Sequence, residues 1–302
     1  MKHTLAIILL SILFGCQSEP SASTAIQGWQ ASLSDSLTEF APGIVSTGQE
    51  FAISFHLEMR EVYFTRLDTG RRFYIYRSLF AESQWQEPQL ASFSGRWRDA
   101  DPFVSPDGER LYFMSYRPLD KADSVETENP KIWYVERLGD TWGEPIALGP
   151  SVNVVDSGSG FPSVDKDYNL YFPSQRRNGQ NDIYFSAYQD GVYQPAVLLA
   201  PSVNDSLASD SNPAINAAGD RLVFYSSREG GLGKVDLYSS HRLADGSWSK
   251  ARNLGPTVNS EAVEYCPAFS PDERVLFFTR RGEEGRIYYR RTEGLFGKTE
   301  GI

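Results

Sequence analysis

Acidic and basic side chains recur at matched points of this 302-residue chain, and they are the first candidates for chemistry. Two carboxylates on either side of a sugar bond can hydrolyse it. An arginine beside a carboxylate instead forms a bidentate ion pair that can hold strands together. The candidate residues for a charged binding rim are Glu50, Asp99, Asp101, Arg117, Asp156, Arg176, Asp210, Arg228, Glu264 and Arg281.

Histidine and cysteine are too rare here for most metal chemistry. The chain has three His and two Cys, and His3 and Cys16 lie in its N-terminal segment. We expect no metal and no cofactor, because a zinc site needs three or four such ligands. The motifs G-x-S-x-G, G-x-x-x-x-G-K-[ST], G-x-G-x-x-G and H-E-x-x-H are absent from the sequence. The net charge of −10 argues against a nucleic-acid partner, which would need a basic surface.

Five similar segments follow one another along the chain, and four of them align on a proline. The anchors are Pro102, Pro162, Pro213 and Pro267. A fifth, degenerate copy at 50–66 has Ile53 in the anchor position. In the copy at 99–117 (DADPFVSPDGERLYFMSYR), a Pro-Asp-Gly turn separates two apolar strands. A third strand and a short fourth strand follow in each copy, and we expect the last fourth strand to run from Phe296 to Ile302.

These segments resemble the TolB-like (WD-like) propeller repeat, with its P-x-x-S-P-D-G-x-x-L-Y-F core and its L-G-P-x-V-N tail. The resemblance covers about 41–302. It implies an all-β fold, a five-bladed β-propeller of four-stranded antiparallel blades. Six blades are the alternative if Gly28-Trp29 begins an extra edge strand, and an open solenoid is a further one. Such a repeat specifies the fold far better than the function.

The recurring charges have two interpretations. An acidic residue at the start of the first strand and an arginine after the second should meet once per blade, because antiparallel neighbours share that end. The pairs would then be structural, and pairing would lower the carboxylate pKa and prevent action as a general acid. Alternatively, the charges form a binding rim around the channel. We assign Gly158 to the acidic position in the third copy, where Asp156 would border a small polar opening.

The N-terminus is typical of an export signal. Thr4–Phe14 is an apolar run too short to span a bilayer as a helix. It ends in Leu13-Phe14-Gly15-Cys16, which resembles a bacterial lipobox. The resemblance implies cleavage before Cys16, lipidation of that Cys, and, with Gln17 next, placement in the outer membrane facing the periplasm. An ordinary secretory signal is the alternative.

The expected organisation is a signal peptide at 1–15, a flexible lipidated tether at 16–40 and a propeller at 41–302. The expected function is a membrane-anchored, non-catalytic module that binds or scaffolds a protein or another component of the bacterial cell envelope. The alternative is a propeller glycoside hydrolase or lyase with carboxylates at the channel mouth.

Overall fold

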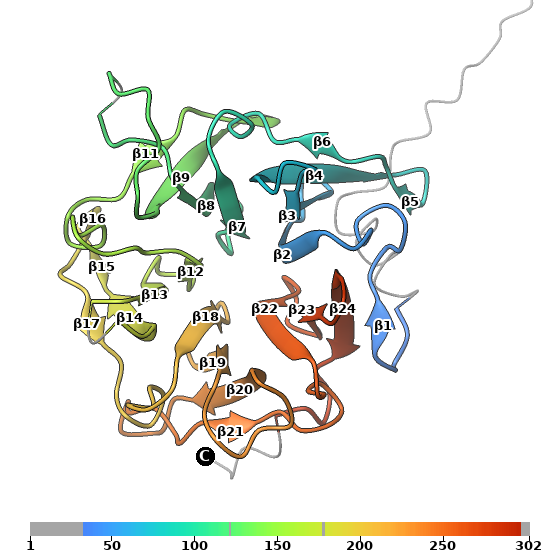
Figure 1. Cartoon of the computed structure of the whole chain (residues 1–302), viewed down its shortest axis with the longest axis vertical. Coiled ribbons are helices and arrows are strands. Elements are labelled where there is room, and N and C mark those ends of the chain that lie inside the picture. The colour runs from blue at the N-terminus through green and yellow to red at the C-terminus, as the bar shows by residue number, and fades with distance from the viewer. Residues whose placement is uncertain (1–32, 121, 177–178, 297–302) are drawn as a thin grey trace, which may run out of the picture.

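The chain forms a ring of five small antiparallel sheets around a central channel (Figure 1). The computed structural model describes residues 33–120, 122–176 and 179–296. Every regular element in this part is a strand, and none of it is a helix that could cross a membrane. The five-bladed all-β propeller is therefore confirmed, and both the six-bladed ring and the open solenoid are excluded for these residues.

Four blades follow the chain order, with the inner strand first. The first blade contains β2 (Glu50–His56), β3 (Glu61–Leu67), β4 (Phe73–Ala81), β5 (Gln84–Trp85) and β6 (Gln89–Leu90). The second contains β7 (Asp99–Val104), β8 (Arg110–Ser115), β9 (Lys131–Leu138), β10 (Thr141–Trp142) and β11 (Ile146–Ala147). The third contains β12 (Ser163–Val164), β13 (Leu170–Ser174), β14 (Asp182–Ser186) and β17 (Val197–Leu198), with the hairpin β15 (Tyr188–Gln189) and β16 (Val192–Tyr193) beside it. The fourth contains β18 (Asp210–Ile215), β19 (Arg221–Ser226), β20 (Asp236–His241) and β21 (Arg252–Asn253).

The fifth blade is completed by the beginning of the propeller chain. Its strands β22 (Val263–Phe269), β23 (Val275–Arg281) and β24 (Gly285–Arg291) are joined by β1 (Thr38–Glu39), which pairs with β24. The fourth strand expected at Phe296–Ile302 is therefore misplaced, and residues 297–302 lie outside the described part. Residues 38–40, assigned by sequence to the tether, belong to this blade. The ring is thus closed by strand pairing between two distant parts of the chain.

Neighbouring blades are held together by aromatic side chains and by the linkers. Trp142 of the second blade donates a hydrogen bond from Nε1 to the hydroxyl of Tyr63 in the first, at 2.8 Å. Both side chains are buried, so this tryptophan packs between blades instead of offering a surface for sugars. In the recurring linker sequence, the Asn153 side chain bonds both the amide and the carbonyl of Ile132. The repeated tail motif therefore has a structural role.

In each blade the backbone turns at one matched residue, in the inner strand or just before it, and this residue lines the channel. The residues are Ala52, Asp101, Phe161, Asn212 and Cys266, and all have φ between 41° and 58°. A positive φ is unusual for residues other than glycine and marks a bulge. The strand register shifts at these positions in four of the blades. Pairing resumes directly after the anchor proline in three of these blades, at Phe103, Ala214 and Ala268.

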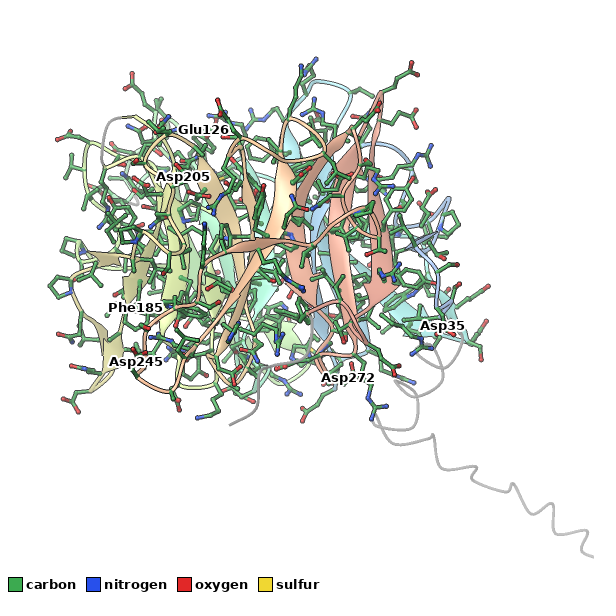
Figure 2. All side chains as sticks on the ribbon, turned by 90° about the horizontal axis from the view of Figure 1, so that it is seen from below. Asp35, Glu126, Phe185, Asp205, Asp245 and Asp272 are labelled. Carbon is green, nitrogen blue, oxygen red and sulfur yellow. The ribbon has the colours of Figure 1, made fainter. Side chains whose placement is uncertain are left out.

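The two ends of the propeller can be named from residues that lie at them. Glu126 and Asp205 lie at one end, and Asp245 and Asp272 lie at the other (Figure 2). The inner strands begin at the first end, which we call the Glu126 face. They finish at the second end, which we call the Asp272 face.

Candidate binding face and central channel

Four blades carry an ion pair between the start of the inner strand and the end of the second strand. The pairs are Arg66 Nε–Glu50 Oε1 (2.7 Å), Arg117 Nη2–Asp99 Oδ1 (2.8 Å), Arg228 Nη2–Asp210 Oδ1 (2.7 Å) and Arg280 Nε–Glu264 Oε1 (2.7 Å). All four carboxylate side chains are 0% exposed. Each arginine also donates to a backbone carbonyl of the preceding linker. The guanidinium therefore ties a blade to the linker that leads into it.

The third blade lacks this pair, and the structure corrects the sequence assignment there. Ser159 bridges to Ser174 across the first two strands. The same two positions hold Asp99 and Ser115 in the second blade. Ser159, and not Gly158, therefore takes the place of the carboxylate. Counting three residues back from Pro162, as Asp99 stands before Pro102, also gives Ser159, so the sequence assignment was wrong by one residue.

Arg176 keeps the position of its four counterparts without their partner. Its Nη2 donates to the carbonyl of Val152, as in the other blades, but its buried Nε has no hydrogen-bond partner in the described part of the chain. Burial lowers the pKa of Arg176. Nearby, Lys131 donates hydrogen bonds to three linker carbonyls, and Asp156 is exposed. Two buried or half-buried cations, Lys131 and Arg176, thus lie where the sequence predicts a polar opening, and the opening itself stays a prediction.

Asp101 and Asn212 face the channel with unsatisfied side chains. Asp101 is 3% exposed and Asn212 is 2% exposed. By donor–acceptor geometry, neither carboxylate oxygen of Asp101 and neither amide atom of Asn212 has a hydrogen-bond partner among the described residues, although the backbone amide of Phe161 lies close enough to favour the charged form of Asp101. The backbone N–H of Asp101 donates to Thr65 Oγ1 of the first blade at 2.9 Å, which fixes the bulge. Buried polar groups are rarely left in this state.

Burial controls the acidity of these carboxyl groups. It raises the pKa of Asp99 and of Asp210, although hydrogen bonds and their arginines act in the opposite direction. The expectation that pairing lowers these pKa values is therefore wrong, because the lost solvation outweighs the attraction. Burial also raises the pKa of Asp101 well above its usual range, and only the backbone amide of Phe161 opposes this rise. Asp101 is the one candidate carboxylate in the inner strands that no arginine holds within the described residues.

An open cleft of about 690 Å³ lies on the Glu126 face between the first and fifth blades. Phe51 and Tyr265 stack in it, with ring centroids 6.4 Å apart and an interplanar angle of 28°. Phe73 packs against the edge of Phe51. The predicted rim residue Arg281 lines this cleft and is exposed, whereas its neighbour Arg280 forms the ion pair. The cleft thus combines aromatic rings with accessible charge.

A second cavity of about 200 Å³ lies toward the Asp272 face. Its walls include the apolar side chains of Phe55, Ile215 and Phe269. The polar residue His56 donates a hydrogen bond from Nε2 to the carbonyl of Gly108, 2.9 Å away, and its Nδ1 accepts from the amide of Met59. Nε2 therefore carries the proton, and burial lowers the pKa of this histidine.

No protein-family model matches this sequence, and no curated protein matches it. Solved structures do match. A putative TolB from Agrobacterium tumefaciens is 16% identical, with 82% of this chain and 78% of that chain covered and a TM-score of 0.53. TolB from Acinetobacter baumannii is 15% identical, with 82% and 53% covered and a TM-score of 0.52, so this chain spans about half of that protein. This chain has a TolB-like β-propeller fold.

Glycosidases share the same architecture as this TolB-like propeller. An α-L-arabinofuranosidase from Lactobacillus brevis is 13% identical, with 83% of this chain and 92% of that chain covered and a TM-score of 0.55. A thermostable family-43 glycoside hydrolase is 11% identical, with 83% and 92% covered and a TM-score of 0.54. At these identities the likeness establishes the fold alone, since one propeller architecture supports unrelated activities.

Sequence reasoning overlooked most of the channel lining of the TolB-like propeller. It selected Asp101 but not Asn212, Phe161 or Cys266, which occupy the matched position in other blades. A signal was present, because each of these residues stands immediately before an anchor proline. Their side chains differ in type from blade to blade, so a search for recurring charge passes over them.

Proposed function

We propose that this protein is a lipid-anchored, non-catalytic binding module whose Glu126 face docks a protein or another envelope component. The observation that carries this proposal is the open cleft between the first and fifth blades. It places Phe51 and Tyr265 beside the exposed Arg281. Aromatic rings and arginine are enriched at the energetic centres of protein interfaces.

The carboxylates held in ion pairs with arginine favour a binding function over glycoside hydrolysis. Glycoside hydrolysis needs two carboxyl groups that both reach the substrate. Asp99, Asp210 and Glu264 are fully buried and already bonded to arginine. Their oxygens would have to leave these partners before they could act on a sugar, which would expose an unpaired buried guanidinium.

The membrane anchor is supported by the lipobox-like sequence Leu13-Phe14-Gly15-Cys16, which lies outside the described residues. Acyl chains on Cys16 would hold the propeller at a membrane through buried CH₂ groups. The test is palmitate labelling in a bacterial host of wild type and Cys16→Ala. We expect label on the wild type alone, and label retained by Cys16→Ala would disprove lipidation at this residue.

Docking on the Glu126 face is tested by site-specific photocrosslinking in intact cells. A photoreactive amino acid is placed at Glu283, which lines the cleft, and at Asp245 on the opposite face as a matched acidic control. We expect a discrete crosslinked species from position 283 that disappears when Tyr265 is changed to Ala. Equal products from both positions, or persistence in Tyr265→Ala, would argue against this face.

Glycoside hydrolysis is kept as a second candidate because of Asp101. Its pKa is raised by burial, a property of general acids. The test is a screen of envelope glycans with wild type, Asp101→Asn and Glu264→Gln. Turnover that both variants abolish would replace the binding proposal, while a complete lack of turnover together with crosslinking at position 283 would support it.

A further inference from the structure

We propose that the channel binds a primary alkylammonium group, with its nitrogen between Asp101 and Asn212 and its alkyl chain directed toward the Asp272 face. The site lies inside the channel and does not depend on a partner docking at the Glu126 face. The cavity at this point has a volume of about 30 Å³ and is lined by residues of all five blades. That volume admits one or two water-sized groups, the size of an ammonium head.

The channel wall offers acceptors and few donors. Asp101 contributes two unpartnered carboxylate oxygens, and Asn212 contributes an unpartnered carbonyl oxygen and amide. The next residue in the wall is a proline in four blades, which has no backbone N–H to donate. A ligand that satisfies this site must therefore bring several donors of its own. An ammonium group carries three.

The charge of the site matches a single monovalent cation. Asp101 has no arginine or lysine against it in the described part of the chain, so a cationic occupant would supply the charge that allows this buried carboxyl group to ionise. No group of three or more His, Cys, Asp or Glu residues that could hold a metal occurs among the described residues. Cys266 also lines the cavity, and its thiol is kept protonated because burial and the nearby Asp101 raise its pKa. The donor set is thus poor for a divalent metal.

The apolar surroundings favour an alkyl substituent on the nitrogen. The small cavity and the 200 Å³ cavity below it share Phe103 and Ala268 in their linings. The lower cavity is bordered by Phe55, Ile215 and Phe269. A chain of several carbons would remove apolar surface from water there, which favours binding. The channel therefore recognises charge at one end and an apolar chain at the other.

The test is calorimetric titration and thermal melting with n-butylammonium chloride, in cacodylate buffer free of amines and phosphate. We expect saturable binding to the full-length protein and a rise in melting temperature. Asp101→Asn should weaken binding at least tenfold, and the variant should fold because asparagine has the same shape and removes the cost of burying an ionisable group. Asn212→Ala should weaken binding less. The control variant Asp140→Asn changes an exposed carboxylate and should bind as the wild type does.

Comparison ligands show which property of n-butylammonium the channel recognises: its charge, its N–H donors or its alkyl chain. n-Butanol lacks the charge, tetramethylammonium lacks N–H donors, and calcium chloride tests a metal site; none should bind at the same concentration. Binding of n-butylammonium alone indicates a free amine as the natural occupant. Additional binding of Nα-acetyl-lysine methylamide indicates a lysine side chain. Equal binding of butanol, Asp101-dependent binding of calcium without the amine, or an unaffected Asp101→Asn variant would overturn the proposal.

Discussion

Arg228 lies with Nη2 2.7 Å from Oδ1 of Asp210, and the same nitrogen donates to the carbonyl of Val203 at 2.7 Å. One guanidinium thus joins the inner strand of the fourth blade to the linker before it. Removing it leaves a fully buried carboxylate without its counter-charge. We expect Arg228→Ala to lower the free energy of unfolding by about 3 kcal/mol, measured by urea denaturation at neutral pH.

The exposed pair Arg274–Asp272 provides the control for this prediction. Its nitrogen and oxygen are 3.8 Å apart, and the arginine side chain is 81% exposed. Arg274→Ala should change the free energy of unfolding by less than about 0.5 kcal/mol, as is usual for surface pairs. If Arg228→Ala changes stability as little as Arg274→Ala, the ring of pairs does not hold the blades together.

The third blade can be given the pair that it lacks. Ser159 faces Ser174, and the unpartnered Nε belongs to Arg176, two residues farther along, as Arg117 follows Ser115. Ser159→Asp should supply the missing carboxylate. We expect a gain of about 1 kcal/mol, because a hydrogen bond to a charged group is offset in part by desolvation. The measurement is urea denaturation.

The matched control is Ser159→Asn, which has nearly the same volume but no charge. It should not reproduce the gain. Equal stability of the Asp and Asn variants would show that Arg176 gains nothing from a carboxylate at this position, and a loss in both would show that the site is too tightly packed for either side chain.

The sequence predicted the ring of ion pairs because identical charges recur in phase in four copies, at Asp99 and Arg117 for example. It misplaced the third copy by one residue, because counting three residues back from Pro162, as from the other anchor prolines, gives Ser159, and the bridge from Ser159 to Ser174 confirms that position. Repeat spacing therefore locates the equivalent position even where its side chain differs, whereas the missing partner of Arg176 Nε is visible only in the structure.

The strand that closes the predicted ring could not be identified from the sequence, for a different reason. β1 has only two residues, Thr38 and Glu39, and its partner is β24 near the other end of the propeller. A two-residue strand has no periodicity of its own. Likewise, the channel residues Asp101 and Asn212 become a site only when blades two and four face each other.

Closure of the ring should depend on Phe40, which directly follows β1. Its side chain is 2% exposed and meets Phe55 and Phe277 edge to face, at 5.7 Å and 5.3 Å between ring centroids. Phe40→Ala should cost about 3–5 kcal/mol of unfolding free energy. The conservative Phe40→Leu should cost less than half as much. If both leave urea denaturation unchanged, this segment does not seal the fifth blade.

The pH dependence of stability should reveal the unpaired carboxyl group of Asp101. Burial raises its pKa in the folded protein, so the folded state holds a proton that the unfolded chain has released. The cost of keeping this carboxyl group protonated is absent below the unfolded pKa of about 4 and grows as pH rises toward the folded pKa. Asp101→Asn removes this cost and should therefore melt at a higher temperature than the wild type at pH 7.

The groups that face Asp101 should not obscure this effect. The pKa values of Tyr116, Tyr265 and Cys266 are all raised, so these groups stay neutral between pH 4 and 7. The difference in melting temperature between Asp101→Asn and wild type should widen steadily from pH 4 to pH 7 in amine-free buffer. A constant difference would mean that Asp101 does not titrate with folding, and a less stable variant at pH 7 would mean that its charge is already compensated in the channel.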